Sequence, residues 1–198
     1  MILDIHVHTT YSTCSRLKLS DVLENARMRG LDGVCVTDHN TIAGRNEVRE
    51  GIQKDGLCLL FGMEYDTPQG DFLVFGPFDD LKPGMDAREL LRFVNSHEGA
   101  VIAAHPFRAD RSVDPSLFAE GLCRIVEGIN GRNTEDENQQ VEKLAQKYGL
   151  VQCGGSDAHQ LSELGKTATR FQIPVSSKGD LVKALREGLC SPVTGQRA

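Results

Sequence analysis

Short apolar and β-branched runs alternate along the whole chain with stretches of helical periodicity. The runs predict strands at 2–7, 34–37, 57–63, 72–75, 100–104, 122–126, 150–153 and 169–173, with a hairpin through 67–70. Helical spacing and capping residues predict helices at 20–30, with Ser20 as the N-cap, at 43–54, 86–97, 134–148 and 178–188, and just after Pro115. This alternation indicates one α/β domain over residues 1–198, built on a largely parallel sheet.

Composition narrows the class of protein. Of the 198 residues, 39% are hydrophobic and 25% are charged, as in a soluble globular protein. The formal net charge of −6 counts against a large nucleic-acid footprint, although bound divalent cations would add positive charge that a residue count omits. The N-terminus has no basic segment of a secretory signal, and no apolar run approaches the ~20 residues that span a bilayer. We therefore expect a cytoplasmic protein without a membrane segment.

The six cysteines are scattered, and none forms a CxxC pair, so a zinc finger or a redox motif is not expected. Cys35, Cys58 and Cys153 lie inside or beside apolar runs, where a thiol behaves as a small hydrophobic group. We expect buried free thiols rather than disulfides.

Polar residues occur at or directly after the ends of six predicted strands. In chain order they are His6 and His8, Asp38 and His39, Glu64, His105, Glu127 and Asn130, and Asp157 and His159. In a parallel α/β sheet or barrel the C-terminal ends of the strands point to one face, where ligands bind. We therefore expect these side chains to meet in one pocket.

These residue types are metal ligands. Neutral imidazole and carboxylate oxygen bind zinc, manganese and iron. His6 and His8 are two apart on a strand, so they point to the same face and can share one ion. Glu64 has two oxygens with which to bridge two ions ~3.5–4 Å apart, as in binuclear hydrolase sites. Such ions can activate water, polarise a phosphoryl group and stabilise a leaving oxygen.

The same residues carry a resemblance to a known family. AspIleHisValHis (4–8), ThrAspHisAsn (37–40), GlyMetGlu (62–64), HisPro (105–106) and GlySerAspAlaHis (155–159) resemble the successive motifs of the PHP (polymerase and histidinol phosphatase) domain. The resemblance covers nearly the whole chain. It implies a distorted seven-stranded β/α barrel, similar to a TIM barrel, with up to three metal ions at the C-terminal strand ends and with phosphoester hydrolysis as the activity.

The resemblance also implies a ligand set. One ion would be held by His6, His8, Glu64 and Asp157, a second by Glu64 and His105, and a third by His39 and His159. Asp38 and Asn130 match family positions close to the site. Many relatives carry a further acid or histidine after the paired histidines, where this chain has Thr13 and Cys14. The second ion also lacks a clear histidine, for which Asp71 is the candidate replacement.

Some of these side chains have an ordinary structural interpretation as well. His97 belongs to no motif and suits a helix C-terminus. Asp38 would equally serve as a turn or cap residue. Arg108 either binds phosphate or pairs with a nearby acid such as Asp110.

Three functions remain open. The leading prediction is a phosphomonoesterase for a small molecule or nucleotide, in which two to three divalent ions (zinc, manganese or iron) activate water beside Arg108, Asp38 and Asn130. A nuclease or phosphodiesterase acting on short oligonucleotides is the alternative, and the acidic composition makes long nucleic acids unexpected as partners. The third is a non-catalytic metal-binding module.

Overall fold

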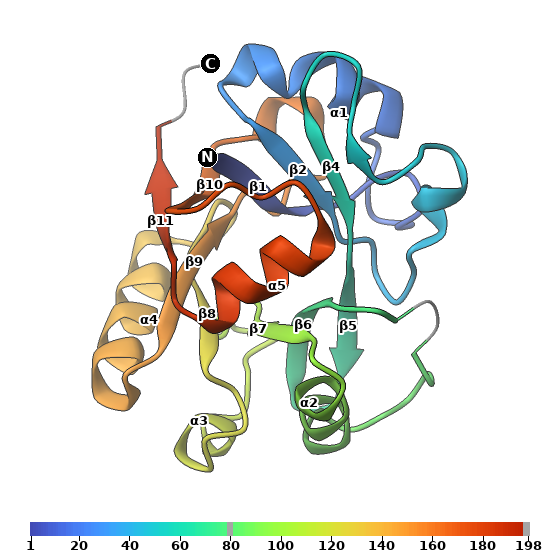
Figure 1. Ribbon diagram of the computed structural model, residues 1–198. Coiled ribbons are helices and arrows are strands. Elements are labelled where there is room, and N and C mark those ends of the chain that lie inside the picture. The colour runs from blue at the N-terminus through green and yellow to red at the C-terminus, as the bar shows by residue number, and fades with distance from the viewer. Residues whose placement is uncertain (79–80, 196–198) are drawn as a thin grey trace.

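A computed structural model describes residues 1–78 and 81–195, which form a mixed α/β fold with two sheets (Figure 1). The first sheet has the order β11-β10-β1-β2-β4-β3. It contains β1 (Ile2–Val7), β2 (Gly33–Val36), β3 (Gly51–Ile52), β4 (Cys58–Phe61), β10 (Thr167–Phe171) and β11 (Cys190–Thr194). The second sheet has the order β5-β6-β7-β8-β9. It contains β5 (Met63–Thr67), β6 (Gly70–Phe75), β7 (Ala100–Ala103), β8 (Ile125–Asn130) and β9 (Val151–Gly155).

The two sheets meet along two lines. On one side β4 passes into β5 with only Gly62 between them, and an added Cβ there would lie 2.5 Å from the Phe75 ring. On the other side β9 lies against β10 and β1. The Thr169 hydroxyl of β10 donates to the Gly154 carbonyl of β9 at 2.6 Å, and just beyond β1 and β9 the His8 amide donates to the Ala158 carbonyl at 2.9 Å. The ends of β1 and β9 are therefore brought together.

Five α-helices among the described residues cover the sheets: α1 (Leu19–Asn25), α2 (Ala87–Ser96), α3 (Ser116–Ala119), α4 (Glu135–Tyr148) and α5 (Lys178–Arg186). Three hydrophobic clusters result. One joins inner side chains of both sheets, such as Ile5 and Leu73, to α5. A second packs α2, α3 and α4 on the second sheet, and a third packs α1 on the first. In Figure 1, α1 lies at one end of the molecule and α2 and α3 at the other.

Several predicted elements are confirmed at their predicted ends. The Thr134 side chain accepts from the Glu137 amide and completes a capping box at the start of α4, which ends at Gly149 with φ +63°. Asp86 caps α2 by accepting from the Glu89 amide. The hairpin through 67–70 joins β5 to β6, and β1 has its predicted bounds.

Other predictions are wrong. The first helix begins at Leu19, so Ser20 lies inside it and is not its cap, and the α-helix ends at Asn25, followed by a 3-10 turn, η1 (Arg27–Arg29). The stretch 43–54 forms only a second 3-10 turn, η2 (Ala43–Asn46), and the short edge strand β3. The sequence pattern missed β11 and a third 3-10 turn, η3 (Leu161–Glu163). The sheets are mixed rather than largely parallel, because β1–β2, β2–β4, β7–β8 and β8–β9 are parallel and the other pairs antiparallel.

The strand count also differs from the expected seven, because the described residues form eleven strands in two sheets. All six cysteines are free. Five of them are buried, as expected for free thiols in apolar runs, and Cys14 is exposed. None of the helices within the described ranges has the length and apolar content needed to cross a membrane.

Candidate metal centre

All seven predicted ligands lie around one space at the ends of β1, β2, β7 and β9 and at the start of β5. They form three overlapping groups whose donor atoms are within 4.8 Å of one another: His6 with His8 and Asp157, His6 with Glu64 and His105, and His8 with His39 and His159. The grouping differs in detail from the one that the family resemblance implies, because His6 and His8 each belong to two groups. We call the group of His8, His39 and His159 the imidazole group.

Glu64 touches two of these groups with different oxygens. Its Oε1 lies 2.8 Å from His105 Nε2, and its Oε2 lies 3.0 Å from His8 Nε2 and 3.4 Å from His6 Nε2. Asp157 Oδ1 faces the same two ring nitrogens, at 3.5 Å from His6 and 3.3 Å from His8. Glu64 therefore has the position expected of a bridging carboxylate.

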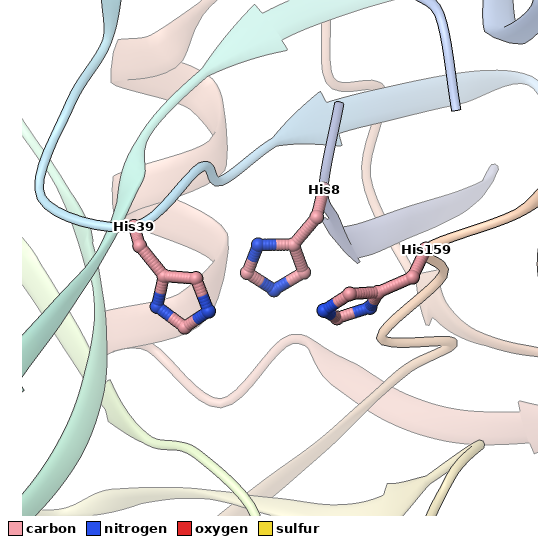
Figure 2. Close-up of side chains that lie close together, drawn as sticks. All are labelled: His8, His39 and His159. Carbon is pink, nitrogen blue, oxygen red and sulfur yellow. The ribbon is translucent and has the colours of Figure 1, made fainter. Parts of the chain in front are cut away.

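The imidazole group draws its three rings from separate segments (Figure 2). The His8 ring lies between the other two, with centroids 4.6 Å from His39 and 4.4 Å from His159. Unlike the other two groups, this group contains no carboxylate. The His39 and His159 rings are partly exposed, whereas His8 is buried.

Several ring nitrogens of the centre have further partners, and these partners are of different kinds. His6 Nδ1 lies 2.9 Å from Glu127 Oε1, and His39 Nδ1 lies 3.1 Å from Asp66 Oδ1. His159 Nδ1 lies 2.8 Å from the Asp157 carbonyl oxygen. His105 Nδ1 is buried and has no hydrogen-bond partner among the described residues. Such outer contacts orient a ligating imidazole and select which nitrogen points at the metal.

Charge at the centre is dominated by buried carboxylates. Burial raises the pKa of Glu64, but His6 and the hydrogen bond from His105 outweigh it and hold that pKa well below its usual range. Burial likewise acts against ionisation of Asp157, yet His6 and His8 lower its pKa strongly. For His159, burial and the neighbouring His8 lower the pKa to about 4. The centre thus offers ionised carboxylates and, at His159, a neutral imidazole.

This donor set fits divalent cations. Buried ionised carboxylates require positive charge beside them, and the closely spaced ring nitrogens of His6 and His8, 3.0 Å apart, both face those carboxylates. Nitrogen and oxygen donors without clustered thiolates match zinc, manganese or iron.

The centre opens into a cavity of about 480 Å³ whose wall includes three arginines. Arg108 Nη2 forms an ion pair with Asp157 Oδ2 at 2.9 Å and donates to two asparagines, Asn130 and Asn133. Arg111 Nη1 donates to Asp71 Oδ2 at 2.9 Å. Arg132 Nη1 lies 2.9 Å from His159 Nδ1, and no carboxylate of the described ranges lies within ion-pair distance of it. Sequence patterns gave no signal for Arg111 or Arg132, which lie in loops.

The other predicted residues surround the ligands. Asp38 accepts from the Thr9 amide and hydroxyl and from the Ser12 hydroxyl, so it braces the loop after β1. Asn130 lies within β8, and its Nδ2 donates to Glu127 Oε2 at 2.8 Å. Asp71 Oδ2 is 4.0 Å from His105 Nε2.

Residues 13 and 14, which follow the paired histidines, lie outside the three donor groups. Thr13 and Cys14 are exposed, and Cys14 lines the cavity. His97 is exposed at the C-terminus of α2, where its Nδ1 donates to the Phe93 carbonyl.

Two of the proposed ligands have left-handed backbone conformations. The φ angle is +28° at His105 and +54° at Asp157. This region is uncommon for residues other than glycine, although Asp enters it more readily than most. Each is the second residue after its strand, β7 or β9, so the chain turns sharply close to the strand ends that bring these side chains to the centre.

Comparison with known proteins identifies the family. A model of the PHP domain matches residues 4–152, and a model of the PHP-associated region matches residues 135–190. The chain therefore belongs to the PHP domain family. It is an enzyme of the metal-dependent phosphoesterase class.

Similar proteins occur in archaea and bacteria. The uncharacterized protein MJ1587 of Methanocaldococcus jannaschii is 30% identical over 160 residues, which are 73% of this chain and 94% of that protein. The crystal structure of PsfC from Pseudomonas syringae has a TM-score of 0.76 at 21% identity, covering 98% of this chain and 91% of PsfC. The lesion-specific endonuclease PfuEndoQ from Pyrococcus furiosus has a TM-score of 0.69 at 16% identity, covering 94% of this chain and 56% of that one.

Proposed function

We propose that this enzyme hydrolyses a phosphate monoester of a small molecule or nucleotide. The observation that carries the proposal is the meeting of three donor groups at one cavity of about 480 Å³ that arginines line. A cavity of this size is in the range of small-ligand sites. Nitrogen and carboxylate donors on one side and guanidinium groups on the other suit an anionic substrate.

We further propose that the ligands are His6, His8, His39, Glu64, His105, Asp157 and His159, and that they hold two to three ions of zinc, manganese or iron. When bound, such ions supply Lewis acidity toward a phosphoryl oxygen and acidify water. In support of a single domain with a distorted barrel, one hydrophobic cluster joins the inner faces of both sheets.

The chain's own residues would do the rest of the work. Arg108 and Arg132 line the cavity, and we propose that they bind the phosphate oxygens. Arg132 is the better placed for this role, since Arg108 is already paired with Asp157. Asn130 orients Arg108 by accepting from it at 2.9 Å, and Asp38 holds the loop that follows the paired histidines. These contacts hold the charged groups in position in the free enzyme, so that they need not rearrange when the phosphate of the substrate binds.

A nuclease is the second candidate, because PfuEndoQ, an endonuclease, has a similar fold. Two observations argue against a long nucleic acid as substrate: the net charge is −6, and the carboxylates Asp110 and Glu137 lie at the cavity wall. Backbone phosphates are bound through basic surfaces that release counterions.

The test is a panel of phosphomonoesters, phosphodiesters and short oligonucleotides, run with elemental analysis of the purified protein. We expect turnover of monoesters that changes little between about 50 and 200 mM salt, because few phosphates are contacted at once. Turnover confined to oligonucleotides, with binding that falls steeply as salt rises, would favour the nuclease. A metal-loaded protein that turns over none of the phosphomonoesters would refute the proposed substrate class.

A further inference from the structure

Ser12 makes a contact that the proposed ligand set does not explain. It lies in the loop after β1 and is 2% exposed. Its Oγ donates to Asp38 Oδ1 at 2.6 Å and accepts from the His39 backbone amide at 3.0 Å. The same oxygen lies 3.2 Å from His8 Nδ1. One hydroxyl thus contacts two segments that provide rings to the imidazole group.

The number of protons on these atoms decides the direction of the hydrogen bond to His8. A serine hydroxyl has one proton and two acceptor positions, and an ionised carboxylate only accepts. The Ser12 proton is therefore committed to Asp38, and both of its acceptor positions face donors. One donor is the amide of His39, so the other must be a proton on His8 Nδ1. If a cation occupies the centre, a neutral His8 then has its lone pair on Nε2, the nitrogen that lies 3.0 Å from Glu64 Oε2 and 3.3 Å from Asp157 Oδ1.

We propose that Ser12, held by Asp38, is a positioning residue that keeps His8 protonated on Nδ1 and presents its Nε2 to the metal centre. This inference rests on the proposed role of His8 as a ligand. It assigns to His8, through an intervening hydroxyl, the kind of outer partner that Glu127 provides directly to His6 at 2.9 Å.

The effect of losing this hydroxyl should be unequal among the three groups. His8 and the backbone of His39 both depend on Ser12, and both belong to the imidazole group. The group of His6, Glu64 and His105 contains neither residue. Removal of an outer partner commonly lowers metal affinity by about 10- to 100-fold. We therefore expect a loss of this size at the two groups that contain His8, which include the imidazole group, and little change at the group that contains His105.

The test uses protein labelled with ¹⁵N at histidine and titrated with Zn²⁺, which is diamagnetic. Ring couplings in the NMR spectrum report which nitrogen of each histidine carries a proton and which binds zinc. In the wild-type protein His8 should carry its proton on Nδ1 and bind through Nε2. In Ser12→Ala, the His159 ring signals should respond only at about 10- to 100-fold higher free zinc, while His105 responds as before. Ser12→Thr keeps the hydroxyl and should restore the wild-type titration.

Ser15→Ala is the matched control, because the Ser15 hydroxyl lies in the same loop but forms its hydrogen bonds with backbone groups: the carbonyls of His8 and His159 and the Leu17 amide. It should leave the His8 proton in place. Binding of zinc through His8 Nδ1, an unchanged titration in Ser12→Ala, or an equal effect of Ser15→Ala would each overturn the inference while leaving the proposed ligands intact. If zinc shifts no histidine of the wild-type protein, the proposed metal centre itself is wrong.

Discussion

The substitution Gly155→Ala should disturb the metal centre, because the added methyl group would press on His6. Gly155 is the last residue of β9, and a Cβ built there would collide with His6 Cβ and lie 2.6 Å from Glu127 Oε1. Ordinary contacts of a Cβ begin at 3.4 Å, so the second separation alone is about 0.8 Å too short. Because both neighbours are fully buried, β9 must move away from β1 or His6 must be displaced.

Overpacking of this kind costs about 1–3 kcal/mol. With a urea m-value of roughly 2 kcal/mol/M for a chain of this size, Gly155→Ala should lower the unfolding midpoint by about 0.5–1.5 M. Displacement of His6 by the better part of an ångström should also reduce turnover by as much as ~10²-fold in the fraction that stays folded. Urea unfolding followed by circular dichroism measures the first effect, and an assay on the preferred phosphate ester measures the second.

Gly179→Ala is the matched control. Gly179 is exposed in α5, and the nearest atom to its added Cβ is Ser177 Oγ at 3.8 Å. Alanine is the better helix former, so this variant should be neutral or more stable by up to about 1 kcal/mol, with unchanged turnover. The packing argument fails if Gly155→Ala unfolds at the wild-type urea concentration. If it unfolds early but its folded fraction is fully active, the placement of His6 does not matter for catalysis.

Three further outcomes are expected. His6→Ala should lose at least ~10²-fold in turnover and His97→Ala almost nothing, and near-full activity of a folded His6→Ala would refute the site. On graded chelation followed by elemental analysis, the ion of the imidazole group should leave first, because that group has no formal negative charge; simultaneous release would contradict this. Alkylation of the native protein, read by mass spectrometry, should modify only Cys14, since the other thiols are buried and burial raises the pKa of Cys123 to about 12. A second labelled cysteine before unfolding would count against the packing described.

The strands and the meeting of the polar residues were predictable because they follow from local patterns. An apolar run fixes where a strand lies, and a polar residue at its end is delivered to the same edge as its neighbours. The sequence pattern thus predicts that Glu64, His105 and Asp157 share one pocket, and all three are buried.

The segment 43–54 shows why other parts were not predictable. Its composition is compatible with a helix, but Gly51 has φ +117° and the segment ends in an edge strand paired to β4. Glu50 accepts from the Phe61 amide at 2.9 Å, a tertiary contact that no local pattern contains. Tertiary pairing therefore overrides the weak local preference.

Glu127 illustrates a second limit. The register between β8 and β9 shifts between Glu127 and Ile129, so a bulge at Gly128 interrupts the regular alternation of the two faces. Glu127 therefore reaches His6 from within a strand, where the sequence pattern had placed it beyond the strand end. Arg132 is a third case, because its approach to His159 depends on loops whose conformations the sequence does not specify.

The left-handed backbone at His105 and Asp157 lowers the stability of the fold at two residues whose side chains are proposed metal ligands. A residue other than glycine in this conformation costs on the order of 1 kcal/mol or more. Glycine at position 105 would relax the turn while removing the imidazole, and asparagine at 157 would tolerate the turn while removing the carboxylate charge. In a mutational scan scored only for soluble expression, we expect both positions to accept these replacements, and in a scan scored for turnover to reject them. The divergence between the two scans would mark the residues that the protein retains for function at the expense of its fold.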